Sequence, residues 1–226
     1  MKRSETKPAK SAGTQGSKRG NGGAKIAGES RITQPAGKRA DALARRRHLV
    51  IAALDLYRSD PSNTTLEAIA EQAGVGIATL YRNFPDRRSL EYACGEYIFA
   101  EMVELQEEII ERMEEDPAAA WSEYVRELTH MQLGAIISPF APDNLDTLPD
   151  TLTTLRAEVA ELGDRIITIA HEHGLVDPAY DHMSFIVGMI TVTRPPVPGI
   201  LALDPKIPGK LAAIFSAGLR QAPPTD

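Results

Sequence analysis

The amino-acid sequence predicts an all-α fold. Apolar residues recur at intervals of three and four along most of the 226 residues, as they do on one face of a helix. No stretch keeps the apolar–polar alternation of a β-strand, and Gly and Pro residues separate the helical stretches. Polar residues break every apolar run well before the length of a membrane span, so no transmembrane helix is expected.

The charge is divided unevenly along the chain. Residues 1–50 hold 13 Lys or Arg and three acidic residues, whereas the remainder holds 12 basic and 28 acidic residues. A basic end joined to an acidic body is typical of a chain with one DNA-facing end. Residues 1–39 are rich in Gly, Ser, Lys and Arg and are expected to form a disordered basic tail. That tail is either merely solvated or an arm that adds phosphate or minor-groove contacts.

A first helix is expected from about Ala40 to Arg58. Its predicted buried face consists of Leu43, Val50, Leu54 and Tyr57. Three adjacent arginines, residues 45–47, precede the apolar part of this helix. Adjacent side chains fan around a helix, so at most one or two of the three can face the same partner.

Residues 64–90, TTLEAIAEQAGVGIATLYRNFPDRRSL, predict two short helices joined by a tight turn. Thr64 and Glu67 fit a capping box at the start of the first of these helices. Gly74 stands where that helix must end, because Gly adopts the left-handed conformation without steric cost. The second helix is expected from Ile77 to Phe84. Two such helices place the second one in the major groove of DNA.

The rest of the chain predicts a series of longer helices. Asp86, Asp116 with Pro117, Asp150, and Asp177 with Pro178 are expected to begin helices, Gly174 to end one, and a last helix is expected at about 208–221. Apolar residues recur at helical spacing, and so form one apolar face of a helix, over Leu90–Met113, Trp121–Ala135 and Leu152–Ile169. Residues 138–149 contain three prolines and are expected to form a loop.

The stretch from about Val50 to Leu90 resembles the N-terminal domain of TetR-type (tetracycline-repressor family) transcriptional regulators. The residues that carry the resemblance are Thr65, Leu66, Ile69, Ala70, Ala73, Gly74, Val75, Thr79, Leu80, Tyr81, Phe84, Arg87 and Leu90. Gly76 stands where the family often has Ser, which weakens the cap of the second helix, and Arg87 replaces the usual Lys. Glu67 lies where some members carry a cation, so little DNA contact is expected there.

The resemblance implies a division into a basic tail (1–39), a helix-turn-helix DNA-binding domain (40–88) and a helical effector-binding and dimerisation domain (89–226). Within the second helix, Arg82 is suited to guanine and Asn83 to adenine. The expected DNA-binding residues are Arg45, Arg46, Arg47, Thr65, Ile77, Ala78, Thr79, Tyr81, Arg82, Asn83 and Arg87.

Aromatic and Met side chains from several helices of the body suit an apolar ligand pocket, although plain core packing is the alternative for each of them. The expected effector-binding residues are Trp121, Tyr124, Met131, Phe140, Phe185 and Met189. The family pairs its last two long helices with those of a second subunit, a role that falls here to about 178–193 and 208–221. The expected interface residues are Met183, Ile186, Gly188, Ile190, Leu211 and Phe215, with a buried monomer core as the alternative.

The resemblance therefore implies a homodimeric, ligand-responsive transcriptional regulator, a repressor that a small apolar effector releases from a palindromic operator on double-stranded DNA. A cytoplasmic location is expected, because no apolar stretch of a secretory signal follows the basic start of the chain. No enzymatic activity, cofactor, metal site or membrane partner is expected, because no nucleophile, Walker or dinucleotide motif stands in a suitable context. His171 and His173 point about 200° apart on a helix and do not share a metal easily. The alternatives are a constitutive or architectural DNA-binding protein without an effector and an α-helical enzyme with an attached DNA-binding head.

Overall fold

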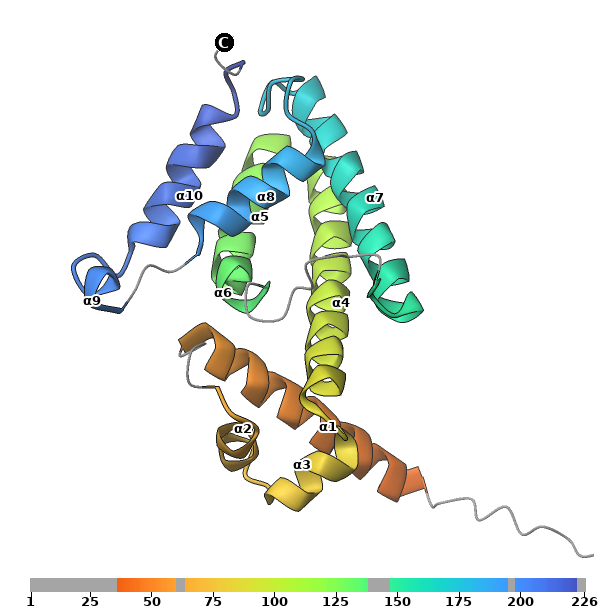
Figure 1. Cartoon of the computed structure of the whole chain (residues 1–226). Helices are drawn as coiled ribbons and strands as arrows, with labels where there is room; N and C mark the ends of the chain where they lie inside the picture. The colour runs from red at the N-terminus through yellow and green to blue at the C-terminus, as the bar shows by residue number, and fades with distance from the viewer. Residues whose placement is uncertain (1–35, 60–63, 138–146, 195–197, 223–226) are drawn as a thin grey trace, which may run out of the picture. The chain divides into compact units, whose positions relative to one another are not determined.

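The structure is a computed structural model that describes residues 36–59, 64–137, 147–194 and 198–222. Ala36–Asp226 belong to one compact unit, and every regular element among the described residues is a helix (Figure 1). The helices are α1 (Ala36–Ser59), α2 (Leu66–Gln72), α3 (Ile77–Asn83), α4 (Arg87–Met113), α5 (Pro117–Met131), α6 (Leu133–Ile137), α7 (Asp150–Glu172), α8 (His182–Val192), α9 (Pro198–Leu201) and α10 (Ile207–Gly218). The predicted all-α class, with an N-terminal helix-turn-helix and a helical body, is confirmed. None of the described helices is both long and apolar enough to cross a membrane.

The helix-turn-helix packs on α1 through the second half of that helix. Val50, Leu54 and Tyr57 are buried, as the spacing predicts. Leu43 was expected on the same face, but it is 68% exposed because burial along α1 begins only at Leu49. The helix also begins at Ala36, before the predicted start at Ala40.

The caps of the short helices differ from the prediction in one position. Thr65 caps α2, because its Oγ1 accepts a hydrogen bond of 3.1 Å from the Ala68 N–H, so the predicted capping box of Thr64 and Glu67 is wrong. Gly74 ends α2 with a φ of +67°, as predicted. Gly76 offers no side chain to the first turn of α3, which leaves that end without a side-chain cap.

Local chemistry correctly predicts how α4 and α5 begin. Asp86 Oδ1 accepts a hydrogen bond of 2.7 Å from the Ser89 N–H, and the Ser89 hydroxyl closes a reciprocal capping box. Asp116 caps α5 in the same way, with Pro117 in its first turn. In α7, however, Pro149 occupies the cap position and Asp150 is already the first helical residue, so the predicted Asp150 cap is wrong.

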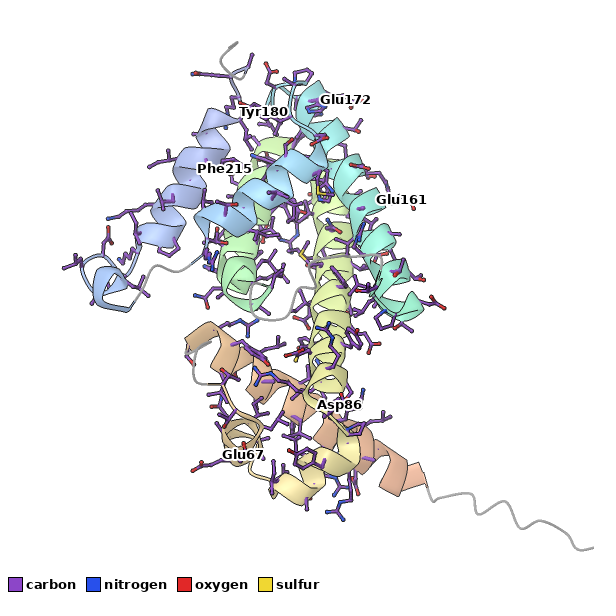
Figure 2. The ribbon with its side chains drawn as sticks, viewed as in Figure 1. Glu67, Asp86, Glu161, Glu172, Tyr180 and Phe215 are labelled. Carbon is purple, nitrogen blue, oxygen red and sulfur yellow. The ribbon has the colours of Figure 1, made fainter. Side chains whose placement is uncertain are left out.

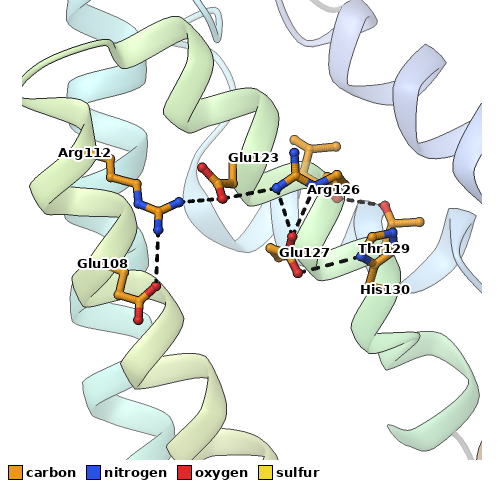
Figure 3. Close-up of polar contacts among 8 residues, drawn as sticks. Glu108, Arg112, Glu123, Arg126, Glu127, Thr129 and His130 are labelled. Atoms are coloured by element: carbon orange, nitrogen blue, oxygen red, sulfur yellow. Dashed lines mark hydrogen bonds and ion pairs between the residues drawn. The ribbon is translucent and has the colours of Figure 1, made fainter.

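The body is built around α4, which packs against α7 and α5. Ion pairs cross the surface between α4 and α5 (Figure 3): Arg112 lies 2.5 Å from Glu123 and 3.8 Å from Glu108. The guanidinium of Arg112 lowers the pKa of the Glu123 carboxyl. Arg126 extends the series toward Glu127. These groups are exposed or half-buried at the surface, so salt screens them and they orient the two helices more than they stabilise the core.

The predicted stripe from Trp121 to Ala135 is interrupted. Gln132 adopts the left-handed conformation (φ 53°) and ends α5, after which α6 starts a new axis. The predicted start of a helix at Asp177 is also wrong: Asp181 caps α8, accepting a hydrogen bond of 2.7 Å from the Ser184 N–H. Asp177 instead links the α7–α8 connection to the end of α10, because its N–H donates a hydrogen bond of 2.7 Å to the carbonyl of Leu219, the cap residue of α10.

Candidate nucleic-acid interface

The second helix of the helix-turn-helix, α3, presents one face to the core and the other to solvent. Leu80 and the following cap residue Phe84 are fully buried and anchor this seven-residue helix. Ile77 and Tyr81, four residues apart on the flank of the helix, are 37% and 46% exposed, and Ala78 and Arg82, on the side opposite Leu80, are also exposed. The side chains predicted to read DNA from this helix therefore lie on its open face.

Hydrogen bonds within α3 hold its polar side chains. Arg82 Nη2 donates to Thr79 Oγ1 at 2.9 Å and Arg82 Nε donates to the Ala78 carbonyl at 3.2 Å. Asn83 Nδ2 donates to the Thr79 carbonyl at 2.8 Å. Arg82 has five N–H donors, so its guanidinium retains donors for a base or a phosphate while these contacts are made.

The flanks of α3 supply further exposed groups. Thr65 lies exposed at the start of α2 and Arg45 lies exposed on α1. Arg47 is exposed as well, but its guanidinium lies 5.6 Å from the centroid of the Tyr97 ring, which draws it toward α4. Among the predicted DNA-binding arginines of α1, Arg45 is thus the exposed one whose guanidinium is not held against an aromatic ring of the described residues.

Arg46 is half-buried and points into the domain. Its Nη1 donates to the Asn83 carbonyl at 2.8 Å, and its guanidinium carbon lies 4.2 Å from the centroid of the Phe84 ring. Both partners stand at the C-terminal end of α3. Arg46 therefore contacts the C-terminal end of α3 directly.

Arg87, the first residue of α4, contacts three different elements. Its Nη1 donates to the Thr64 carbonyl at 3.0 Å, its Nη2 to the Tyr57 hydroxyl at 3.1 Å, and its Nε to Glu91 Oε1 at 2.9 Å. Tyr57, Thr64 and Glu91 are all buried. Burial raises the pKa of Tyr57 to about 12, and the positive charge of Arg87 opposes part of that rise.

Sequence reasoning missed the partners of Arg87. The position of Glu91, four residues after Arg87 on one helix, is a readable signal for an ion pair. The contacts of Arg87 with the Tyr57 hydroxyl and the Thr64 carbonyl cannot be predicted from spacing, because they depend on how α1 and the α1–α2 connection pack against α4.

The residues predicted to bind an effector lie mainly against one another. Trp121, Tyr124 and Phe185 are buried, with ring centroids 4.9 Å apart for Trp121 and Phe185 and 5.7 Å apart for Tyr124 and Phe185. Met189 is buried as well, and Met131 is half-buried at the end of α5. The sixth predicted residue, Phe140, lies outside the described residues.

Two polar contacts bind this aromatic group to its surroundings. The Trp121 indole N–H donates to Ser216 Oγ on α10 at 3.2 Å. Gln106 Nε2, fully buried on α4, donates to the Tyr124 hydroxyl at 3.0 Å. Among the residues that the structure describes, Gln106 Oε1 is buried without a hydrogen-bond partner.

Two of the grooves on the described part of the body lie elsewhere. One follows the outer face of α7 and the other lies between the end of α8 and the start of α10, with a volume of about 360 Å³. The second groove is lined by Thr191, Val192, Arg194, Leu203, Asp204, Ile207, Pro208 and Leu211. None of the predicted effector-binding residues that the structure describes lines either groove.

The residues predicted for the dimer interface divide into two groups. Met183 and Leu211 are exposed, whereas Ile186, Gly188, Ile190 and Phe215 are half-buried within the chain. The structure adds two large apolar side chains that the prediction left out: Val187 is 52% exposed and Ile214 is 68% exposed. Both α8 and α10 therefore present apolar surface to solvent in the isolated chain.

Comparison with known proteins places the helix-turn-helix in a family. Residues 52–92 match the family model described as bacterial regulatory proteins, tetR family. No curated protein compared with the chain matches it.

The fold as a whole is similar to several solved structures. A TetR transcription regulatory protein from Mycobacterium vanbaalenii is 20% identical, with a TM-score of 0.54 over 81% of this chain and 99% of that one. A TetR transcriptional regulator from Streptomyces coelicolor is also 20% identical, with a TM-score of 0.55 over 79% and 99% of the two chains. The transcriptional regulator FadR from Bacillus subtilis, in complex with stearoyl-CoA, is 17% identical, with a TM-score of 0.50 over 76% and 98%.

Proposed function

This chain belongs to the tetR family of bacterial regulatory proteins through residues 52–92, and we propose that it is a homodimeric transcriptional repressor that a small apolar effector releases from a palindromic operator. The observation that carries the proposal is the open face of α3. Ile77, Tyr81 and Arg82 stand free of the core on a short helix that Leu80 and Phe84 anchor beneath them. A helix held in this way is suited to the major groove of double-stranded DNA.

Within this proposal each part of the chain has a separate task. Residues 40–88 read DNA through α3, with Thr65 and Arg45 beside it, and residues 89–226 bind the effector and the second subunit. Residues 1–39 carry a basic tail that adds affinity for any DNA sequence. Two reading helices occupy successive major grooves only when they stand about 34–36 Å apart, so a small tilt of α4 lowers operator affinity.

The exposed apolar side chains of α8 and α10 support the homodimer. Met183, Val187, Leu211 and Ile214 are each exposed in the isolated chain, and covering them with a second copy removes apolar surface from water. A symmetric pair of chains also matches a palindromic operator.

The effector is proposed to be small and mainly apolar. The regulator FadR of similar fold was solved with stearoyl-CoA, whose acyl chain is apolar. In this chain the aromatic group of Trp121, Tyr124 and Phe185 on α5 and α8 supplies apolar surface at the centre of the body.

A second candidate function is a constitutive DNA-binding protein without an effector. The packing of the same three aromatic rings favours it, because ring centroids 4.9–5.7 Å apart are already in contact with one another. An effector at this place must separate rings that now fill the core.

The DNA-binding proposal is tested with a duplex that the wild-type protein selects from a random-sequence library. Tyr81→Ala and Arg82→Ala are expected to weaken binding to that duplex by about 1–3 kcal/mol each, measured by fluorescence anisotropy, with unchanged circular dichroism. Arg165→Ala, an exposed arginine on α7, is the matched control and should bind as the wild type does. Unaltered affinity of both α3 variants would remove this helix from the interface.

The two candidate functions are separated by adding stearoyl-CoA and shorter fatty acyl-CoA esters to the complex with the selected duplex. Release of DNA together with a rise in melting temperature supports an effector-controlled repressor. Stable DNA binding and an unchanged melting temperature across that series favour the constitutive binder.

A further inference from the structure

Two arginines donate hydrogen bonds to backbone carbonyls at the two ends of the α2–α3 unit. Arg87 donates to the carbonyl of Thr64, immediately before the cap of α2, and Arg46 donates to the carbonyl of Asn83, the last residue of α3. The helix-turn-helix is thus bracketed by two guanidinium groups. One comes from α1 and the other from the first turn of α4.

The contact of Arg46 fixes the end of α3 that the helix itself leaves free. Carbonyls in the last turn of a helix have no partner inside it, and a seven-residue helix has few internal bonds to resist bending. Arg46 supplies a partner for the Asn83 carbonyl and packs its guanidinium 4.2 Å from the Phe84 ring centroid. Since Arg46 lies on α1, the orientation of α3 is tied to that longer helix.

The contacts of Arg87 use the planar fork of a guanidinium. Three of its nitrogens bond separately to Thr64, Tyr57 and Glu91, which belong to the α1–α2 connection, α1 and α4. The ammonium of a lysine is a point charge and does not reproduce this spread of donors. Glu91 also compensates the positive charge, so Arg87 offers less attraction to a phosphate than an unpaired arginine does.

We propose that Arg46 and Arg87 are positioning residues: they clamp the two ends of the helix-turn-helix to α1 and α4, and so set the angle at which α3 meets DNA, without acting as phosphate ligands. The inference rests on the proposed DNA-binding function and deepens it. It separates the arginines near α3 into two kinds. Arg45 is free to bind phosphate, whereas Arg46 and Arg87 act through the backbone of the reading unit.

The test compares charge-retaining and charge-removing variants of all three arginines. Arg46→Lys, Arg46→Gln, Arg87→Lys and Arg87→Gln are measured beside Arg45→Lys and Arg45→Gln, the matched controls. Each protein is titrated with the duplex selected by the wild type and with a random-sequence duplex of equal length, across a series of KCl concentrations. Circular dichroism and thermal melting verify that each variant is folded.

For a clamp, Lys and Gln have the same effect. All four variants of Arg46 and Arg87 should lose about tenfold or more in affinity for the selected duplex. Their affinity for the random duplex and their salt dependence should stay at the wild-type values, because no phosphate contact is lost. Arg45→Gln should weaken both duplexes alike and reduce the slope of log K against log salt by about 0.9, and Arg45→Lys, which keeps the charge, should lose clearly less affinity and less slope than Arg45→Gln.

The opposite pattern overturns the proposal. If Arg46→Lys and Arg87→Lys bind as the wild type does, while the Gln variants weaken both duplexes and flatten the salt dependence, the two arginines are phosphate ligands. Should Arg87→Gln unfold because buried Glu91 keeps only its longer ion pair with Arg88 (3.7 Å), the double variant Arg87→Gln/Glu91→Gln replaces it and must show the clamp pattern. A wild-type protein that selects no duplex from the library overturns the DNA-binding function together with the clamp, whereas a selected duplex with the phosphate pattern overturns the clamp alone.

Discussion

Phe215 of α10, labelled in Figure 2, lies so close to Gly188 of α8 that a Cβ at Gly188 would overlap its ring. Phe215 also stacks with Phe185, with ring centroids 6.4 Å apart and an interplanar angle of 15°. The close approach that Gly188 permits is therefore made within one chain. The two helices are joined to each other through this contact, and their remaining apolar side chains are the ones available to a second subunit.

Gly188→Ala should destabilise the fold. The added methyl group must push Phe215 aside in a packed region, which costs about 1–3 kcal/mol of unfolding free energy, measured by urea denaturation. The double variant Gly188→Ala/Phe215→Leu should recover part of that loss because the shorter side chain leaves room. Gly218→Ala, in the last residue of α10 where a Cβ meets open space, is the control and should not destabilise. Equal stability of Gly188→Ala and the wild type would contradict the observed contact.

Charged residues at Val187 and Ile214 should separate the proposed dimer without unfolding the chain. Both side chains are more than half exposed in the isolated chain, so Val187→Asp and Ile214→Asp cost little in the monomer. In an apolar interface between subunits the same unpaired charges are expensive. Sedimentation velocity should show monomers, and affinity for the selected duplex should fall with the loss of the second reading helix.

The control for this experiment is Leu43→Asp, an equally exposed apolar residue on α1, which should leave the oligomeric state unchanged. Intact dimers of both the Val187 and Ile214 variants would place the interface on other helices. The stripe from Leu152 to Ile169 is a poor replacement, because Leu152, Leu162 and Ile166 are buried within the chain.

Local chemistry made several helix ends predictable, both in the helix-turn-helix and in the body. Gly74, Asp86 and Asp116 act where short-range steric and hydrogen-bonding rules place them. The same rules failed where the sequence offers two equivalent candidates. Thr64 and Thr65 are both suited to an N-cap, and which of them caps α2 is decided by the burial of Thr64 and by the bond of its carbonyl to Arg87.

The spacing of apolar residues could not predict features that depend on contacts between distant parts of the chain. The break at Gln132 lies inside a continuous apolar stripe, and nothing in its neighbours marks a left-handed residue. Asp177 and Asp181 are both plausible caps, and the bond of the Asp177 N–H to the Leu219 carbonyl settles the choice only in the folded chain. In the candidate site, the exposed face of α3 followed from spacing, whereas the inward turn of Arg46 did not, because its partner lies 37 positions away.

The pH dependence of stability should contain a contribution from His182. Its imidazole is buried over Gly163 of α7, and burial lowers its pKa from 6.5, although Asp164 and Asp181 oppose the shift. The unfolded chain then takes up a proton near pH 6.5 while the folded chain does not. The stabilising contribution is complete above that pH and is lost as the pH falls below it.

Urea denaturation at pH 7.5 and at lower pH values measures this contribution. The unfolding free energy of the wild type should fall with pH more steeply than that of His182→Leu, which has no imidazole to titrate. Val187→Ala, at an exposed position of the same helix, removes no titratable group and should keep the wild-type slope. Identical slopes for the wild type and His182→Leu would mean that His182 is as easily protonated in the folded chain as in the unfolded one.

The buried pair of Gln106 and Tyr124 should be energetically coupled. Tyr124→Phe removes the hydroxyl that accepts from Gln106 Nε2 and leaves a buried amide without this partner, at a cost of about 1–3 kcal/mol of unfolding free energy. Gln106→Leu/Tyr124→Phe removes both polar groups from an apolar environment and should be more stable than Tyr124→Phe alone. Tyr180→Phe, at a half-buried tyrosine on the edge of the core, is the control and should change stability little.

The outcome also bears on whether the body holds an effector. Gln106 Oε1 lacks a partner among the described residues, and a buried amide oxygen in this state lowers stability unless another molecule donates to it. If Gln106 serves only the core, the double variant keeps the wild-type response of the DNA complex to acyl-CoA esters. If that response is lost while the double variant stays folded and dimeric, Gln106 is in contact with the effector. A Tyr124→Phe variant as stable as the wild type, with no gain in the double variant, would contradict the coupling itself.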